Sequence, residues 1–123
     1  MANSIIYKNG ITPQEYLTEN SRWYLDSDIK KSLQGVGTVT YTTCSYQEQN
    51  ITSTPVSLGT NQDFLYLKND TLSIDDVLIS VDNQINYPVL LKPGDVFCSK
   101  LSADAQVYIK SNGKSIIEYI LAT

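Results

Sequence analysis

The sequence predicts an all-β protein, and three observations support this prediction. Residues that favour strands (Ile, Val, Thr, Tyr, Phe and Trp) occupy 43 of the 123 positions, whereas alanine occupies only 4. From residue 35 onward, strand-like runs recur about every ten residues with turn-forming residues between them, which is typical of a β-sandwich or a small barrel. A mass of 13.7 kDa is enough for one domain with a real core. We therefore expect a single β-sandwich of about seven or eight strands, preceded by a segment with one or two short helices.

Residues 1–34 carry the only helix signals, and we expect this N-terminal segment to anchor the protein. Thr12-Pro13-Gln14-Glu15 combines an N-cap, a proline at the first helical position and a capping-box glutamate, which predicts a helix over about 13–20. Asp26 or Ser27 could cap a second short helix that ends just before the first strand. Helices this short are marginal in water. The segment therefore has to dock, either on its own domain or on a neighbouring subunit.

Apolar residues gather within and after the first predicted helix. The run Arg22-Trp23-Tyr24-Leu25 holds the only tryptophan, and Tyr16 and Leu17 belong to the predicted helix. Large aromatic side chains dominate the energetics of many protein interfaces. Five residues are therefore the candidate interface: Tyr16, Leu17, Trp23, Tyr24 and Leu25.

Residues 35–123 are predicted to form the β-sandwich domain. Each run is rich in β-branched and aromatic residues, and in several of them apolar and polar residues alternate, which predicts one buried face. The predicted strands cover residues 36–46, 55–58, 64–68, 77–81, 87–91, 96–99, 106–110 and 115–121.

Two turns and the last strand have distinct sequence signals. Lys92-Pro93-Gly94-Asp95 places proline and glycine where a type II turn requires them. Asn112-Gly113 predicts a two-residue hairpin between the last two strands. The run 115–121 is apolar on both faces apart from Glu118, whereas a strand buried on one side should alternate. We expect this strand to be central, or to be covered by the N-terminal segment or another subunit.

The charge balance argues against nucleic acid and membrane partners. Nine basic and thirteen acidic residues give a net charge of −4, and Arg22 is the only arginine. A domain that binds a nucleic acid backbone usually presents a basic face. No apolar run reaches the roughly 18 residues that a membrane span requires. The first residues do not resemble a secretory signal, so we expect synthesis in the cytoplasm.

The sequence offers few groups for catalysis, a cofactor or a metal. Histidine is absent, which removes the commonest general base and the commonest zinc ligand. Cys44 and Cys98 lie far apart in strand-like runs, and we expect two buried thiols rather than a disulfide. Asp26-Ser27-Asp28 begins like a calcium loop, but lysines follow where further oxygen ligands are needed. We predict no catalytic, cofactor-binding or metal site.

The sequence offers specific candidate residues for two other classes of function. A glycosidase needs two facing carboxylates, and the candidates for them are Asp75, Asp76, Asp95 and Glu118. A carbohydrate-binding module could use tyrosines that fall in strands, namely Tyr41, Tyr46, Tyr66 and Tyr108. Glycan arrays would test the second function, and a structure that brings two carboxylates together across a cleft would support the first.

Three motifs stand out in the stretch from Phe64 to Thr123, which is about half of the chain: Ile79–Asp82, Leu91–Asp95 and Val107–Ser111. Through these motifs the stretch resembles the small β-sandwich structural proteins of tailed bacteriophage virions. The resemblance implies a jelly-roll-like sandwich in a non-enzymatic virion protein. It provides no catalytic residues to transfer to this chain.

Among virion proteins, the resemblance favours a head decoration or auxiliary capsid protein that binds the major capsid protein or other virion proteins. The alternatives are a component of the head–tail junction, the tail or a head fibre, with a glycan as a further ligand. We expect a homo-oligomer, such as a trimer, or symmetric copies on the capsid lattice.

Overall fold

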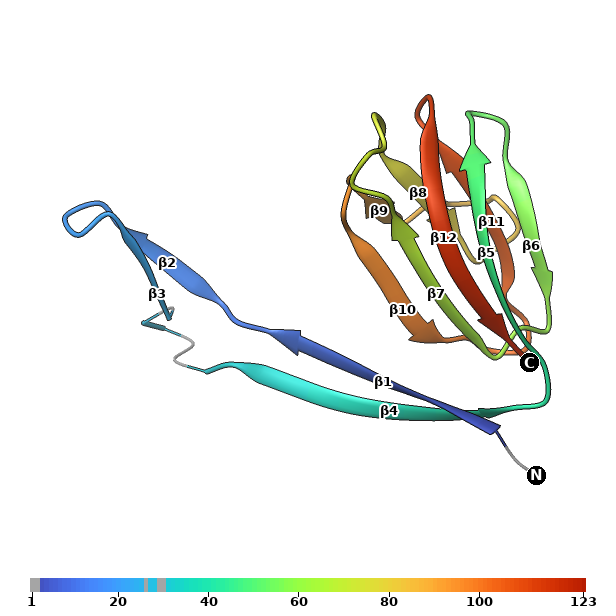
Figure 1. The fold of residues 1–123 in the computed structure, drawn as a ribbon, viewed down its shortest axis with the longest axis horizontal. Coiled ribbons are helices and arrows are strands. Elements are labelled where there is room, and N and C mark those ends of the chain that lie inside the picture. The colour runs from blue at the N-terminus through green and yellow to red at the C-terminus, as the bar shows by residue number, and fades with distance from the viewer. Residues whose placement is uncertain (1–2, 26, 29–30) are drawn as a thin grey trace. The chain divides into compact units, whose positions relative to one another are not determined.

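The computed structural model describes residues 3–25, 27–28 and 31–123, and this part of the chain is all-β: it contains twelve strands and no helix (Figure 1). The chain divides into two compact units. Ile5–Thr38 form the N-terminal unit, and Val39–Thr123 together with the first four residues form the C-terminal unit.

The N-terminal unit consists of two pairs of strands. Strand β1 (Asn3–Ile11) lies beside β4 (Leu33–Tyr41), whereas β2 (Gln14–Leu17) and β3 (Arg22–Leu25) form a separate antiparallel hairpin. Glycine at position 37 allows close packing between β1 and β4, because a Cβ there would overlap the ring of Tyr7.

The prediction of helices in this unit was wrong. Residues expected to form the helix over 13–20 form strand β2 and a turn instead, and Ser21 in that turn has a positive φ of 51°. Glu15, the expected capping residue, accepts hydrogen bonds from the backbone N–H and the hydroxyl of Ser27. The cross-strand pair of Tyr16 and Trp23 explains the outcome, because aromatic pairs across strands stabilise a hairpin and a lone short helix gains no such contact.

The second predicted helix lies partly outside the described residues, since it includes positions 26, 29 and 30. Its expected C-terminal end is strand rather than helix, because β4 begins at Leu33. Strand β4 also runs through the predicted boundary between residues 34 and 35, and the division between the two units follows Thr38.

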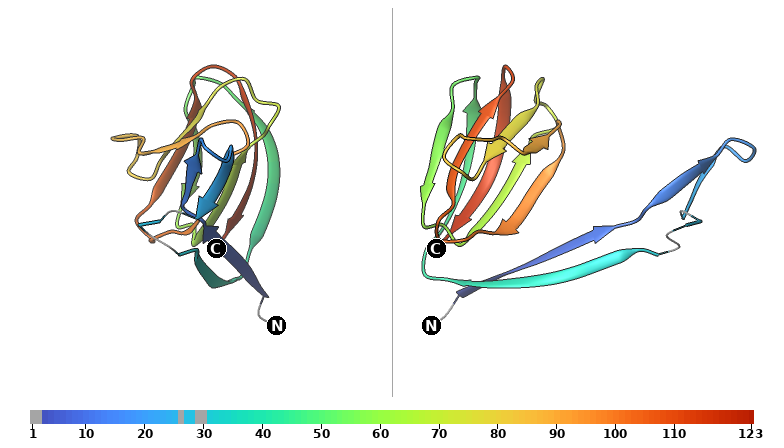
Figure 2. Two further views of the ribbon diagram at one scale, coloured as in Figure 1. Left: turned by 90° about the vertical axis from the view of Figure 1, so that its left-hand side faces the viewer. Right: turned by 180° about the vertical axis from the view of Figure 1, so that it is seen from behind.

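The C-terminal unit contains two four-stranded sheets that share one core (Figure 2). The first sheet has the strand order β10-β7-β12-β5, and the second has the order β6-β11-β8-β9. The bounds of the eight strands are Cys44–Ile51 (β5), Val56–Thr60 (β6), Phe64–Asn69 (β7), Val77–Ser80 (β8), Val89–Leu91 (β9), Val96–Lys100 (β10), Gln106–Ser111 (β11) and Ser115–Ala122 (β12).

Four antiparallel pairs in this unit are nested along the chain. Strand β8 pairs with β9, β7 with β10, β6 with β11 and β5 with β12. The last strand, β12, is central because it also pairs with β7, and this position confirms the prediction from its apolar composition. The residues that pair with β12 are Cys44–Ile51 of β5 and Phe64–Asn69 of β7.

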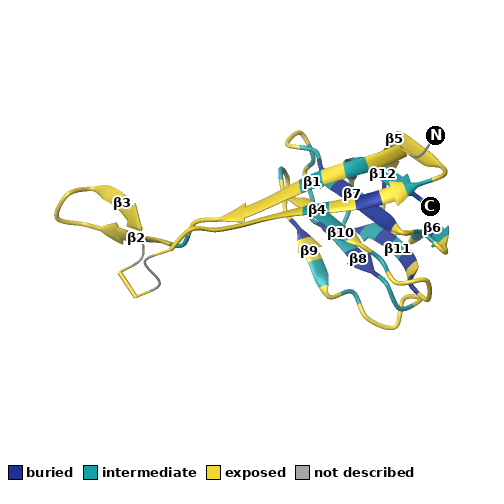
Figure 3. Cartoon of the chain, turned by 90° about the horizontal axis from the view of Figure 1, so that it is seen from below, coloured by how far each residue is buried: buried dark blue, intermediate teal, exposed yellow. Residues whose placement is uncertain are grey.

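The core lies between the two sheets, and the buried residues of the chain are concentrated in the C-terminal unit (Figure 3). Inward-facing residues alternate with outward-facing ones, so that Ile117 and Tyr119 of β12 are buried while Ile116 is partly exposed. The fully buried apolar side chains include Leu65, Leu67, Val77, Ile79, Val107, Ile109 and Ile117.

The two predicted turns had different outcomes. The turn at Lys92–Asp95 is confirmed: Gly94 has a φ of 95°, and the Asp95 N–H donates to the Lys92 carbonyl at 2.9 Å. The hairpin at Asn112-Gly113 is wrong, because β11 and β12 belong to different sheets. A Cβ on Gly113 would overlap the carboxylate of Asp75, so glycine is needed there for close packing rather than for a hairpin.

Candidate functional site

All five predicted interface residues belong to one element, the β2–β3 hairpin. The register pairs Tyr16 with Trp23, and their ring centroids lie 5.3 Å apart with the planes tilted by 54°. Because side chains alternate along a strand, Tyr16, Trp23 and Leu25 share one face, and Leu17 and Tyr24 share the other. The hairpin therefore presents large apolar side chains on both of its faces.

These side chains are exposed in the chain by itself, and Trp23 is the most exposed of the five at 62%. The paired strands of the same unit add four more exposed apolar side chains, namely Ile6, Ile11, Leu33 and Val36. A two-stranded sheet is at best marginally stable in water. The strand pairs of the N-terminal unit therefore expose large apolar side chains and have little core of their own.

The charges are divided unequally between the two units. The N-terminal unit contains four basic residues (Lys8, Arg22, Lys30 and Lys31) and four acidic ones (Glu15, Glu19, Asp26 and Asp28), so that its net charge is zero. The whole net charge of −4 therefore belongs to the C-terminal unit. The N-terminal unit therefore has no net charge that would repel a partner surface of either sign.

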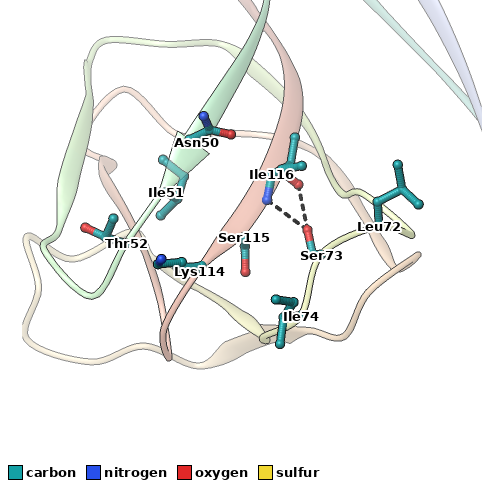
Figure 4. A pocket seen from close by; sticks show the side chains of 9 residues that line it. All are labelled: Asn50, Ile51, Thr52, Leu72, Ser73, Ile74, Lys114, Ser115 and Ile116. Atoms are coloured by element: carbon teal, nitrogen blue, oxygen red, sulfur yellow. Dashed lines mark hydrogen bonds between the residues drawn. The ribbon is translucent and has the colours of Figure 1, made fainter.

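The C-terminal unit contains an apolar pocket of about 410 Å³ at one end of β5 and β12 (Figure 4). The hydroxyl of Ser73 accepts from the Ile116 N–H at 2.8 Å and donates to the Ile116 carbonyl at 3.0 Å, which joins the loop after β7 to β12. Leu72 and Ile74 on this loop are 80% and 82% exposed. The remaining lining residues are Asn50, Ile51, Thr52, Lys114 and Ser115. Sequence reasoning missed this pocket because it treated the loop as a turn, although Leu72 and Ile74 are apolar residues in a polar segment.

A tyrosine and two carboxylates meet on the outward face of β5 and β12. The Tyr46 hydroxyl lies 2.9 Å from Glu48 Oε1 and 2.8 Å from Glu118 Oε2. These hydrogen bonds to Glu118 and Glu48 raise the pKa of Tyr46 well above its usual range. Glu118 faces Glu48 on one side and Lys68 on the other in the register of the sheet. It is therefore a surface carboxylate with polar neighbours rather than a buried acid.

Two other glycosidase candidates bond to the backbone. Asp75 Oδ2 accepts from the Lys114 N–H at 2.8 Å, and Asp95 Oδ2 accepts from the Lys92 N–H at 3.0 Å. These contacts give each carboxylate a structural role, the stabilisation of a turn. The described part of the chain holds no cluster of three or more Cys, Asp or Glu side chains that could bind a metal ion.

Two of the four candidate tyrosines share the outward face of one sheet. Tyr46 and Tyr66 flank Ile120 on the outward face of the first sheet, whereas Tyr108 belongs to the second sheet and Tyr41 to β4. Burial raises the pKa of Tyr66, and the charge of Glu118 adds to this effect.

The two cysteines are free, as predicted, but they are not both buried: Cys44 is exposed and Cys98 is half-buried. Within the residues described, the chain has no helix of the length and apolarity needed to cross a membrane. A comparison with protein-family models, with curated proteins and with solved structures found no match for this chain.

Proposed function

We propose that this chain is a non-enzymatic structural protein of a tailed bacteriophage particle, a head decoration or auxiliary capsid protein that binds the capsid through its N-terminal unit. The observation that carries this proposal is the β2–β3 hairpin, whose large apolar side chains are exposed on both faces. Full burial of one such side chain contributes about 1.5–3 kcal/mol. Burial of Trp23, Tyr16 and Leu25 against a capsid protein would provide the central apolar contact of the interface.

The strand order of the C-terminal unit supports the same proposal. Four nested antiparallel pairs, divided into sheets of order β10-β7-β12-β5 and β6-β11-β8-β9, have the arrangement of an eight-stranded jelly roll. Jelly rolls are common in viral capsid and lectin domains. Because fold alone does not determine function, this likeness adds weight only beside the exposed N-terminal unit and the resemblance of residues 64–123 to phage virion proteins.

The binding proposal predicts a difference between two matched sets of substitutions. The triple variant Tyr16→Ala, Trp23→Ala, Leu25→Ala removes one apolar face of the hairpin. The control variant Leu72→Ala, Ile74→Ala removes exposed apolar side chains from the C-terminal unit. Purified protein is sedimented with capsids of the phage that encodes the chain, and the pellet is quantified.

We expect the triple variant to lose most of its capsid binding and the control to bind like the unmodified chain. Equal binding of the triple variant and the unmodified chain would exclude the hairpin as the anchor. Sedimentation of the protein without capsids tests the accompanying proposal of a homo-oligomer or of symmetric lattice copies.

The second candidate is a tail, head-fibre or head–tail junction component whose jelly roll binds a glycan. Tyr46 and Tyr66 favour it, since they flank Ile120 beside the carboxylate of Glu118, and aromatic rings with nearby polar groups suit a sugar. A glycan array with the unmodified chain and with Tyr46→Ala tests this candidate. Binding that Tyr46→Ala abolishes would support it, and no binding at millimolar glycan would reject it.

A further inference from the structure

The edges of the two sheets in the C-terminal unit differ in how they are protected. Natural sheets block exposed edges with short strands, proline, bulges or lysine. Strand β9 has three residues and lies between Pro88 and Pro93. Strand β6 follows Pro55 and has an irregular register opposite Val107 and Tyr108. Strand β10 is five residues long and ends in Lys100.

Strand β5 is the exception among these edges. It pairs with β12 over eight consecutive residues from Cys44 to Ile51 without a break in register, and in the described part of the chain no other strand pairs with its far side. It contains no proline, lysine or arginine, and Glu48 is its only charged residue. The far edge of β5 thus offers a long, regular row of backbone donors and acceptors, which is a template for adding another strand.

We propose that β5 is a self-association surface, which pairs antiparallel with β5 of a second copy of this chain around a two-fold axis. Side chains of β5 point alternately toward the core and away from it. Both cores therefore lie on the same side of the joined sheet only if core-facing residues of one copy stand opposite core-facing residues of the other. The register centred on Glu48 places two identical carboxylates opposite each other, which is destabilising. The register centred on Gln47 avoids this and joins Cys44–Asn50 of both copies.

The Gln47 register also matches the polar groups of β5. It places Tyr46 opposite Glu48 of the second copy, and the two-fold symmetry also places Glu48 opposite Tyr46 of the second copy. In the single chain, one Tyr46 hydroxyl proton serves two carboxylates, Glu48 at 2.9 Å and Glu118 at 2.8 Å. In the pair each Tyr46 still has one hydroxyl proton, so the register adds no donor, but it places no carboxylate directly opposite another. The same register sets Ser45 opposite Gln49 and Gln47 opposite Gln47 of the second copy, and these side chains can each donate and accept a hydrogen bond. This self-complementary register favours a second copy over an unrelated strand as the occupant.

The register makes a sharp prediction for disulfide cross-linking. In a Cys44→Ser background, Gln47→Cys places two cysteines directly opposite each other, a separation that a disulfide can span. Native Cys44 lies opposite Asn50 of the second copy, so two Cys44 residues are about 20 Å apart and cannot cross-link within the pair. The matched control is Thr60→Cys in the same background, because Thr60 is exposed at the end of the protected edge strand β6.

Mild oxidation of the full chain, followed by non-reducing electrophoresis, is the experiment. We expect a covalent dimer from Gln47→Cys and little dimer from the unmodified chain or from Thr60→Cys. Equal cross-linking at positions 47 and 60, or none at 47, would overturn the proposal. The Gln47 side chain accepts from the Tyr119 hydroxyl at 2.8 Å, and Gln49 offers a second acceptor at 3.3 Å, so the substitution leaves that hydroxyl a partner.

A second measurement does not depend on cysteine. Gln47→Lys places two like charges on the axis, and we expect it to weaken self-association by about tenfold or more in sedimentation equilibrium. Circular dichroism and the Tm establish that the variant is folded. Unchanged self-association of folded Gln47→Lys would exclude the β5 pair. An unmodified chain that stays monomeric up to about 100 μM would exclude it as well. The triple variant of the β2–β3 hairpin should still cross-link through Gln47→Cys, so failure of capsid binding and failure of the β5 pair can be told apart.

Discussion

Asn69, on β7 of one sheet, donates from its side-chain amide to the carbonyl oxygen of Leu91, on β9 of the other sheet, at 2.9 Å. The same Nδ2 group lies 3.1 Å from the carbonyl oxygen of Asp75, which precedes β8. Asn69 is completely buried, so its bond to Leu91 connects the two sheets away from water, and its bond to Asp75 holds the segment that leads into β8.

Replacement of Asn69 by alanine should therefore lower the free energy of unfolding by about 2–4 kcal/mol, because two backbone carbonyls lose their donor and a cavity remains. Urea denaturation measures the change. Asn112→Ala, at an exposed asparagine, is the control and should change stability by less than about 0.5 kcal/mol. A loss below 1 kcal/mol in Asn69→Ala would contradict the proposed importance of this link.

Gly113→Ala should destabilise the protein although Gly113 has no positive φ. The added methyl group overlaps the Asp75 carboxylate, which is held by its bond to the Lys114 N–H. Overpacking of this kind costs about 1–3 kcal/mol. Asp75→Ala should itself be destabilising, but in that background Gly113→Ala should cost clearly less. Additive effects in a double-mutant cycle by urea denaturation would show that the two residues do not interact.

The two thiols should react at different rates. Cys44 is exposed, whereas burial of Cys98 raises the pKa of its thiol and reduces its thiolate fraction. At pH 8, we expect Ellman's reagent to react with one thiol in a fast phase and with the other about tenfold or more slowly. Cys44→Ser should remove the fast phase. A single phase from the folded, unmodified chain would contradict this assignment.

The loop after β8 should be weakened by acid. The Asn86 N–H and the Ser80 hydroxyl donate hydrogen bonds to the Asp82 carboxylate. These bonds, the one from Asn86 most strongly, lower the pKa of the Asp82 carboxyl below its usual value. A lowered pKa in the folded state means that the ionised carboxylate contributes stability above the unfolded pKa of about 4, and that this contribution is lost as pH falls through the folded pKa.

Asp82→Ala should consequently have a lower Tm than the unmodified chain at pH 7, and the difference should shrink as the pH falls from 4 to 2. Thermal melts followed by circular dichroism at several pH values measure it. Asp104→Ala, which changes another carboxylate of the same unit, is the control for net charge. A Tm difference that stays constant over this range would show that the Asp82 charge does not stabilise the loop.

Much of the strand content could be predicted from local sequence. The runs 64–68, 77–81, 106–110 and 115–121 match β7, β8, β11 and β12 to within a residue or two at their ends. The match is good because strand-favouring residues are concentrated in these runs, and because 77–81 and 106–110 also show the apolar period of two of a half-buried strand. The run 36–46 was expected to be one strand, but residues 42 and 43 separate β4 from β5.

The pairing of strands and the fold of residues 5–38 could not be predicted in the same way. Asn112-Gly113 has the sequence of a tight hairpin, yet the strands beside it join different sheets because each has a partner far away in the chain. Pro13 and Glu15 suit the start of a helix, but Tyr16 gains a cross-strand contact with Trp23 that local signals do not reveal. The aromatic cluster was visible as a run at Arg22–Leu25, while the free edge of β5 became visible only with the sheet order.

The nested pairing has a consequence for how fast the protein folds. Cys44 pairs with Ala122 and Ile51 with Ser115, so the first and last strands of the C-terminal unit must find each other across nearly the whole unit. Chains dominated by such distant contacts have a high contact order and fold in milliseconds to seconds rather than microseconds. Until β12 has been synthesised and has inserted between them, β5 and β7 both lack β12 as a pairing partner. The nascent chain thus exposes strand edges longest at β5, where local sequence protects them least.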